Sequence, residues 1–209
     1  MKVAIFGASG PTGKLAVQQA LAQGHQVTAF VRNPEKFTQS HPGLTVIKAD
    51  ALIPSTFENY LKGHDVVLSA LGIGQSFKDT SLYSESGKNI IEAMRKSRVH
   101  KFICLTSGGV EDDDPSFEFV YKLIFRRLLR KPYDNMKKLE SYLQSVNDID
   151  WIIVRPSRLT DTPLTGIYRV SPRYAPKGGS KISRTDIAQF MLNQLNSTEW
   201  LRKTPTLTY

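Results

Sequence analysis

Three glycines near the N-terminus, Gly7, Gly10 and Gly13, have the spacing of a loop that binds phosphate through its backbone. They follow the apolar run at residues 3–6, which is typical of a buried parallel strand, and they precede a helical pattern. Glycine allows a sharp turn and a close approach of the backbone to a ligand, because it has no Cβ. The positive end of the following helix favours a diphosphate. We predict a dinucleotide site whose phosphate loop comprises Gly7, Ser9, Gly10, Pro11, Thr12 and Gly13; the alternative is an ordinary glycine-rich turn.

The residue that ends the second predicted strand indicates which dinucleotide binds. The strand covers residues 26–31, and Arg32 follows it, about twenty residues after the glycines, where NAD sites usually carry an acidic residue. A guanidinium matches a 2′-phosphate better than a neutral diol. Lys36 adds a positive charge nearby, and Glu35 comes three residues after Arg32. The sequence therefore favours NADP over NAD; a solvated surface charge at Arg32 is the alternative.

Strands and helices alternate along the chain, which predicts that one parallel sheet carries these residues. Further strands are expected at 44–48, 65–71, 102–106, 151–154 and 205–209, and helices at 15–23, 54–61, 82–97, 134–145 and 183–195. This alternation is typical of an α/β protein with a doubly wound parallel sheet. Ligands bind such sheets outside the carboxyl ends of the strands. We expect one crevice to be lined by the phosphate loop, Arg32, Asp50, Ala51, Leu71, Gly72, Ser107, Pro156 and Ser157.

Length and composition indicate one globular domain. The chain has 209 residues, of which 40% are hydrophobic and 22% are charged, as in ordinary globular proteins. We expect a single dinucleotide-binding domain over residues 1–209, with a small substrate-side elaboration at about 155–209. No run of residues approaches the length of a membrane span, and the N-terminus reads as a strand. The single cysteine, Cys104, lies in an apolar run, so we predict a cytoplasmic protein without disulfides or membrane insertion.

The formal net charge is +9, and much of it falls in one segment. Between residues 121 and 139, apolar residues alternate with Lys122, Arg126, Arg127, Arg130, Lys131, Lys137 and Lys138. Such a pattern fits a membrane-surface helix, a nucleic-acid patch or an amphipathic helix with a solvated basic face. We predict the last, because the segment lies between two strand signals, and we expect no nucleic-acid partner. The acidic run at residues 111–114 is expected to be a solvated loop.

The order of these motifs resembles that of the atypical short-chain dehydrogenase/reductases. The resemblance covers nearly the whole chain, is greatest to the biliverdin-IXβ reductase / flavin reductase group, and extends more loosely to NmrA-like proteins. It is carried by GASGPTG at 7–13, VR at 31–32, AD at 49–50, LG at 71–72, TS at 106–107, VRP at 154–156, PLTG at 163–166 and ISRTDIA at 182–188. It implies a Rossmann-type fold that binds NADP (NADPH). By this resemblance, Asp50 and Ala51 contact the adenine, Leu71 and Gly72 the central part, Ser107 lies near the nicotinamide, and Pro156 and Ser157 close over it.

The chain departs from these families in its catalytic groups. The flavin reductase group carries a histidine beside the substrate, where this chain has Ser157, and all four histidines fall in turns or before strands. No group of His, Cys and carboxylate residues has metal-ligand spacing, so we expect no metal. Tyr133 and Lys137 match the Tyr-x-x-x-Lys spacing of short-chain dehydrogenases, but Glu140 departs from the usual register. We therefore rank Ser107 ahead of Tyr133 and Lys137 as the catalytic candidate, with solvent supplying a proton.

Two classes of function fit these observations. The first is an NADPH-dependent reductase that passes hydride to an anionic or planar small molecule such as a flavin, a quinone or a biliverdin. The second is a non-catalytic NADP(H)-binding regulator that senses redox state and signals to a protein partner, as NmrA-like proteins do. The weak set of proton donors favours the regulator, whereas the lack of a long substrate domain favours the reductase. We predict the reductase.

Overall fold

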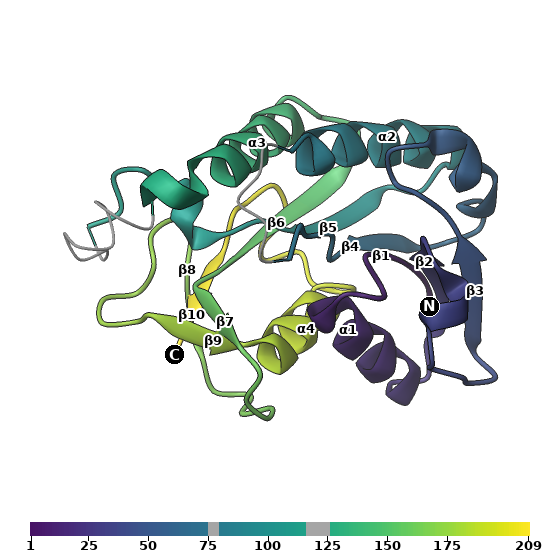
Figure 1. Cartoon of the computed structure of the whole chain (residues 1–209), viewed down its shortest axis with the longest axis horizontal. Helices are drawn as coiled ribbons and strands as arrows, with labels where there is room; N and C mark the ends of the chain where they lie inside the picture. The colour runs from purple at the N-terminus through teal and green to yellow at the C-terminus, as the bar shows by residue number, and fades with distance from the viewer. Residues whose placement is uncertain (75–79, 116–125) are drawn as a thin grey trace.

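An eight-stranded sheet forms the centre of the molecule, and its strand order is β3-β2-β1-β4-β5-β6-β10-β8 (Figure 1). The structure is a computed structural model and describes residues 1–74, 80–115 and 126–209. All pairings from β3 to β10 are parallel, and β8 joins antiparallel at one edge. The strands of this sheet are β1 (Lys2–Phe6), β2 (Gln26–Val31), β3 (Leu44–Lys48), β4 (Val66–Ser69), β5 (Lys101–Leu105), β6 (Asp150–Pro156), β8 (Arg169–Ser171) and β10 (Thr206–Thr208). The expected doubly wound parallel sheet is therefore confirmed.

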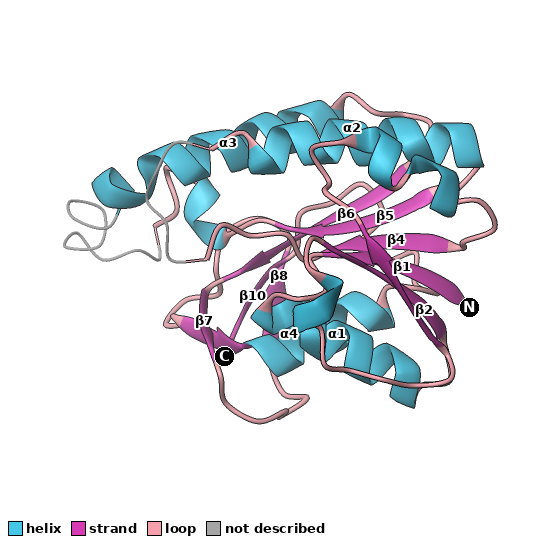
Figure 2. Cartoon of the chain, turned by 45° about the vertical axis from the view of Figure 1, so that its right-hand side comes forward, coloured by secondary structure: helices cyan, strands magenta, loops and turns pink. Residues whose placement is uncertain are grey.

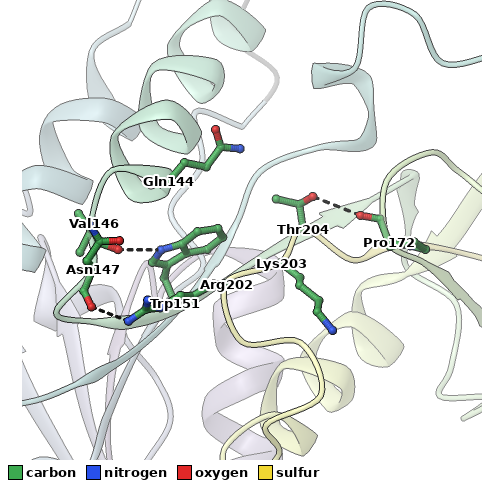
Figure 3. Close-up of a pocket in the computed structure, with 8 residues that line it drawn as sticks. All are labelled: Gln144, Val146, Asn147, Trp151, Pro172, Arg202, Lys203 and Thr204. Atoms are coloured by element: carbon green, nitrogen blue, oxygen red, sulfur yellow. Dashed lines mark hydrogen bonds between the residues drawn. The ribbon is translucent and has the colours of Figure 1, made fainter.

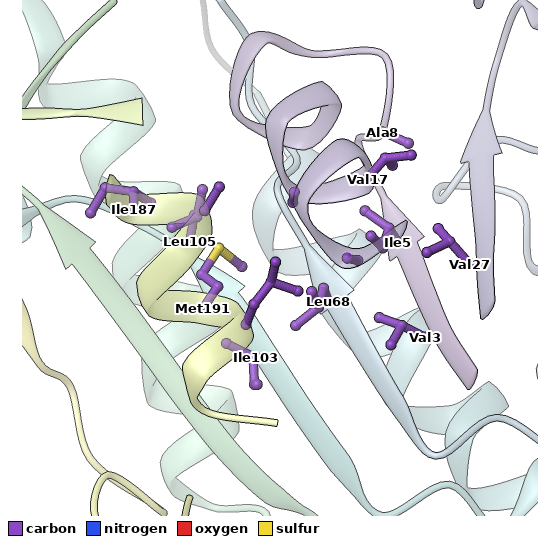
Figure 4. Packing of buried hydrophobic residues seen from close by; sticks show 14 of the residues in the cluster. Val3, Ile5, Ala8, Val17, Val27, Leu68, Ile103, Leu105, Ile187 and Met191 are labelled. Carbon is purple, nitrogen blue, oxygen red and sulfur yellow. The ribbon is translucent and has the colours of Figure 1, made fainter. Parts of the chain in front are cut away.

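Helices cover both faces of the sheet, which explains why its central strands are apolar on both sides. Helices α1 (Pro11–Ala22) and α4 (Arg184–Asn193) cover one face, and α2 (Leu82–Ser97) and α3 (Arg126–Gln144) cover the other (Figure 2). Under α1 and α4, strand residues such as Ile5, Leu68 and Ile103 pack against Val17 and Met191 (Figure 4). The two hydrophobic layers hold β1 rigidly in the middle of the sheet, between β2 and β4.

The helix ends follow from local chemistry. Gly10 is the N-cap of α1 and Pro11 occupies its first turn, where a missing N–H costs nothing. Gly24, at φ +78°, follows the end of the same helix. At the start of α4, the Ser183 hydroxyl accepts a hydrogen bond from the Asp186 amide at 2.9 Å, as its capping sequence predicts. The sequence therefore sets where both helices on this face begin.

The structure corrects the expected helix at residues 54–61. The chain instead forms two 3-10 turns, Pro54–Thr56 and Glu58–Tyr60, separated by Phe57 at φ −140°. Phe57 is fully buried, and its ring packs edge-on against Phe6 with 5.0 Å between ring centroids. Burying this ring against the sheet outweighs the continuity of a short helix.

The C-terminal part of the chain contains strands that the sequence analysis did not predict. A separate parallel pair joins β7 (Arg158–Thr160) to β9 (Lys181–Ser183), and β8 extends the main sheet through β10. Within the described residues, α3 spans Arg126–Gln144 and contains Pro132, so part of the expected basic segment and the expected helix at 134–145 form one helix. Residues 116–125, including Lys122 of the expected basic helix, lie outside the described residues. Within the ranges that are described, no helix combines the length and apolarity needed to cross a membrane.

Candidate functional site

The predicted site residues follow the carboxyl ends of consecutive parallel strands. In sheet order they are Asp50 after β3, Arg32 after β2, Gly7 after β1, Leu71 after β4, Ser107 after β5 and Pro156 at the end of β6. Because these strands are all parallel, the residues lie along one edge of the sheet. The strand order reverses at β1, because β2 and β3 lie on one side of it and β4, β5 and β6 lie on the other. Ligands of α/β sheets bind outside the carboxyl ends of the strands at such a reversal point.

The phosphate loop contains two glycines that packing requires and one, Gly10, that is less constrained. A Cβ on Gly7, which has φ +72°, would lie 2.6 Å from the Ala70 carbonyl carbon, and a Cβ on Gly13 would lie 2.1 Å from the Gly7 oxygen. Gly10 has φ −73°, and a Cβ there would meet only the Gly7 oxygen, at 3.2 Å. Gly7 therefore lets the loop approach the chain that follows β4, and Gly13 lets the first turn of α1 approach Gly7, whereas Gly10 has only one close neighbour.

The start of α1 fits an anionic group. Its N-cap, Gly10, provides no side-chain cap, and its first turn carries no acidic residue. The first amide N–H groups of the helix therefore point toward the crevice with the positive end of the helix dipole. Ser9 and Pro11 are exposed beside them, and the Thr12 side chain is buried. These residues fit a dinucleotide diphosphate, which is held by backbone amides in such loops.

The end of the crevice near β2 and β3 carries the groups assigned to the adenosine. Arg32 is exposed directly after β2 and forms no ion pair within the described part of the chain. The Asp50 carboxylate accepts a hydrogen bond from the Leu52 amide at 3.0 Å, which fixes the turn after β3. The Asn89 side chain donates to the Ala51 carbonyl at 3.1 Å and ties this turn to α2. Arg32 is thus available to an incoming phosphate, while Asp50 and Ala51 are held in place.

A tyrosine that the sequence analysis did not single out lies beside the end of β4. Leu71 is half-buried and Gly72 is exposed, and the Tyr83 hydroxyl lies 3.9 Å from where a Cβ on Gly72 would be. Burial raises the pKa of Tyr83, and the nearby Tyr133 raises it further, although a backbone hydrogen bond at Ile73 opposes them. Tyr83 therefore remains a neutral hydroxyl at this point of the crevice. Tyr83 is the second residue of α2, and no sequence motif marks a residue at that position as part of a site.

Ser107, which follows β5, starts a turn against which Tyr133 packs. The Ser107 hydroxyl accepts a hydrogen bond from the Gly109 amide at 3.2 Å and starts the 3-10 turn Gly108–Val110. The Tyr133 ring lies on this turn, so that a Cβ on Gly109 would be 2.5 Å from its hydroxyl. A Cβ on Gly108 would lie 3.5 Å from the Pro156 oxygen. Tyr133 and Pro156 thus lie beside the turn that follows Ser107.

Lys137 and Ser157 are turned toward other partners. The Lys137 ammonium contacts the Asp112 carboxylate at 2.5 Å, in the loop that follows β5. The Ser157 hydroxyl donates to the Thr208 hydroxyl at 3.1 Å, which links β6 to β10. Lys137 is therefore held by the acidic loop, and Ser157 by the neighbouring strand.

Residues 111–114 form the expected loop, and Asp112 and Asp113 are exposed, but Glu111 is half-buried and Asp114 is buried. Glu111 contacts Arg155 at 2.5 Å and Arg173 at 3.3 Å, and Asp114 is fully buried and accepts from the Ala175 amide. Asp113 contacts Arg173 at 3.1 Å. The C-terminal elaboration folds back onto the loop and supplies these partners. Sequence composition could not show this, because the partners lie about sixty residues further along the chain.

The histidines lie away from the crevice, as expected. His25 and His100 directly precede β2 and β5, and His64 lies two residues before β4, at the amino edge of the sheet; His41 lies in the turn before β3. Across the residues for which positions are described, no group of three or more His, Cys, Asp and Glu side chains could hold a metal.

Two cavities of about 400 Å³ each lie apart from the phosphate loop. The first is at the start of β6 and is lined by residues that include Gln144, Trp151, Arg202 and Lys203 (Figure 3). Trp151 is only 4% exposed, and its indole donates to the Val146 carbonyl, so its ring cannot stack on a ligand. The second lies beside the ion pairs of the acidic loop. Neither cavity contains the predicted dinucleotide site.

The fold and the loop geometry define a Rossmann-type dinucleotide-binding protein. A family model described as NAD(P)H-binding matches residues 7–198. The chain therefore belongs to this NAD(P)H-binding family, as the sequence resemblance implied.

Individual relatives and solved structures agree with this assignment. An uncharacterised chloroplastic protein of Arabidopsis thaliana is 29% identical over 95% of this chain and 73% of its own. A candidate NADH-flavin reductase from Streptococcus pneumoniae is 24% identical, with a TM-score of 0.79 and coverage of 100% of this chain and 99% of its own. A short-chain dehydrogenase/reductase from Veillonella parvula, solved with NADP, is 16% identical, with a TM-score of 0.81 and coverage of 100% and 94%. These two structural likenesses establish the fold.

Proposed function

We propose that this protein is an NADPH-dependent reductase that transfers hydride to a planar acceptor of the flavin, quinone or biliverdin type. The observation that carries the proposal is the placement of the Ser107 and Tyr133 hydroxyls on the same sheet edge as the phosphate loop. Ser107 follows β5, two strands from β1, which is about 10 Å at ordinary strand spacing. A dinucleotide whose diphosphate lies on the loop can therefore present its nicotinamide beside Ser107. The solved NADP complex and the candidate flavin reductase of the same fold support this proposal.

Each part of the cofactor has residues of suitable chemistry. The phosphate loop and the start of α1 would hold the diphosphate, and Arg32 would bind the 2′-phosphate in preference to a neutral ribose. Asp50 and Ala51 would hold the adenine, as the family resemblance implies. Bound NADPH supplies a hydride from its nicotinamide ring.

The chain's own residues position the acceptor. The Ser107 hydroxyl is fixed by the Gly109 amide, so it can donate its own proton in a hydrogen bond to an acceptor oxygen or nitrogen. The Tyr133 ring packs against Gly109 in the turn that follows Ser107 and supports that turn. Reduction of a flavin needs little proton donation from the protein, because the acceptor equilibrates with solvent. This chemistry suits a site whose lysine is held by Asp112.

The test is NADPH oxidation with a panel of flavins, quinones and biliverdins, compared with NADH. We expect at least one planar acceptor to be reduced with preference for NADPH. The Gly10→Val variant is the matched control, because it obstructs the phosphate loop. If the wild-type protein binds NADPH to saturation and reduces no acceptor in the panel, the reductase proposal fails.

A non-catalytic NADP(H)-binding regulator is the second candidate. It is favoured by the contact between Lys137 and Asp112, which withdraws the lysine from the tyrosine-lysine arrangement of short-chain dehydrogenases. This function predicts different affinities for NADP⁺ and NADPH, together with a protein partner that binds only one of the two loaded forms. Titration of both cofactors followed by pull-down of each form tests it.

A further inference from the structure

A buried ion pair lies behind the proposed active site, between α3 and β6. Glu140 is 3% exposed and Arg155 is 4% exposed. The Arg155 Nε donates to Glu140 Oε1 at 3.1 Å, and its Nη2 donates to Oε2, so the contact is bidentate. Thr106 donates its hydroxyl proton to Glu140 Oε1 at 2.6 Å. The Glu140 carboxylate thus joins α3 to the ends of both β5 and β6.

A buried ion pair of this kind adds little to the stability of a folded protein. Removing two charges from water costs several kcal/mol per ion, and apolar residues of similar volume are often as stable or more so. Its placement therefore calls for another explanation. A bidentate guanidinium-carboxylate pair fixes direction as well as distance, because both groups are planar.

The contacts of this pair surround Ser107. Thr106 immediately precedes Ser107, and Arg155 immediately precedes Pro156, which contacts the turn after Ser107. The second arm of Arg155 donates to Glu111 at 2.5 Å, directly after the 3-10 turn. The segment that carries Ser107 is therefore held before the serine by Glu140 and after it by Arg155.

We propose that Glu140, through Arg155 and Thr106, is a positioning residue for the proposed reductase. It holds the Ser107 turn against Pro156 and so fixes the direction in which the Ser107 hydroxyl faces the acceptor. It touches neither the cofactor nor the acceptor. The inference rests on the proposed function for its effect on turnover, but the ordering of the turn is a property of the protein alone.

The main test is the double variant Glu140→Leu/Arg155→Met, which replaces the pair by apolar side chains. We expect its melting temperature to stay near the wild-type value, because the two most buried charges are removed together and Glu111 keeps its contact with Arg173. We expect kcat to fall about tenfold or more, since small misplacements of a positioning group are costly. We expect the Kd for NADPH to change less than about twofold, because the phosphate loop and Arg32 are untouched.

Hydrogen exchange supplies a readout that does not need turnover. The amides of Gly109, Val110 and Glu111 all bond within the turn, and we expect them to exchange about tenfold faster in the cofactor-free double variant. The control is Arg95→Met/Asp148→Asn, which removes an exposed bidentate pair with contacts of 2.7 and 2.8 Å. It should leave kcat and these exchange rates unchanged.

The outcomes separate this inference from the proposed function. Wild-type kcat or unchanged exchange of the turn in the folded double variant overturns the positioning role. If the wild-type protein reduces no acceptor, the reductase proposal fails while the exchange result still decides whether Glu140 orders the turn. Should the double variant not fold, Thr106→Val removes one hydrogen bond and should lower kcat about threefold with faster exchange; a silent Thr106→Val overturns the proposal.

Discussion

At the residue scale, Arg32 is the group on which cofactor choice depends. It is exposed at the end of β2, with no ion pair to any residue in the described ranges that a bound phosphate would have to displace. We predict that NADP(H) binds more tightly than NAD(H) and that Arg32→Ala weakens NADP binding by roughly 1.5–3 kcal/mol, the usual value of a charge-assisted contact. Titration of both cofactors into both proteins measures this. Lys62→Ala, which removes an exposed charge elsewhere, is the control, and equal affinity of the wild type for the two cofactors contradicts the assignment.

Ser107 acts, in the proposed mechanism, after the cofactor has bound. We predict that Ser107→Ala lowers turnover several-fold with little change in NADPH affinity, which is the pattern of a group needed for the chemical step. Tyr133→Phe keeps the ring that packs on Gly109 and should do little. Steady-state kinetics with the best acceptor, together with NADPH titration, measures both. A large loss in Tyr133→Phe with a silent Ser107→Ala reverses this ranking of the two hydroxyls.

The site residues that sequence could predict are those that follow strand ends. The position of Arg32, Asp50 or Ser107 follows from strand order alone, because parallel strands end at one edge. Tyr83 and the Glu140–Arg155 pair could not be predicted in this way. Their placement depends on contacts between α2, α3 and β6 that no local pattern encodes.

At the scale of elements, different glycines of the N-terminal strand-turn-helix unit are expected to serve cofactor binding and stability. We predict that Gly10→Val abolishes NADPH binding but leaves the fold intact, because φ −73° suits any residue and the added Cβ would meet only one backbone atom, the Gly7 oxygen at 3.2 Å. Gly13→Ala should instead destabilise the protein by about 3 kcal/mol, since its Cβ would lie 2.1 Å from the Gly7 oxygen. Cofactor titration and urea unfolding of both variants test the contrast. Normal NADPH binding by folded Gly10→Val would show that the loop is purely structural.

The amino edge of the sheet carries a pH-dependent contribution to stability. Burial lowers the pKa of His64 below its usual 6.5, although its hydrogen bond to the Leu61 carbonyl opposes this. The unfolded chain therefore binds the proton more readily, so stability is full above pH 6.5 and falls as the pH drops toward the folded value. We predict that His64→Gln flattens this dependence between pH 7.5 and about 5.5 in urea unfolding, because glutamine does not titrate. Parallel curves for the variant and the wild type would contradict it.

Element boundaries show where local signals fail. The 3.6-residue apolar pattern predicted the bounds of α2, Leu82–Ser97, and the capping serine, Ser183, predicted where α4 begins. The run at 54–61 misled because burial of Phe57 interrupts the helix. Strands β7, β8 and β9 have only three residues each, which is too few for an alternation of apolar and polar residues to be recognised in the sequence.

At the scale of the whole molecule, the C-terminal elaboration is anchored on a single buried carboxylate. Asp186 is fully buried at the start of α4. It accepts hydrogen bonds from the Thr165 amide and hydroxyl at 3.0 Å, the Gly166 amide at 2.7 Å, the Ser183 hydroxyl at 2.8 Å and the Tyr209 hydroxyl at 2.5 Å. The loop after β7, the strand β9 and the last residue of the chain thus converge on one side chain. The elaboration holds its place through this point and through the acidic loop at 111–114.

We predict that Asp186→Asn destabilises the protein by about 3 kcal/mol, or about 10 °C in melting temperature. Burial raises the pKa of Asp186, but hydrogen bonds from Tyr209 and Gly166 outweigh it and hold the pKa below 3.8, so the native group is ionised. An asparagine places two N–H donors among groups that themselves donate, and leaves several of them unsatisfied. Tyr209→Phe removes one donor and should cost about 1 kcal/mol. Thermal and urea unfolding measure both, with Asp161→Asn at the exposed ion pair to Arg184 as the control. If Asp186→Asn is no less stable than this control, the elaboration is held by its strands and apolar contacts rather than by the buried carboxylate.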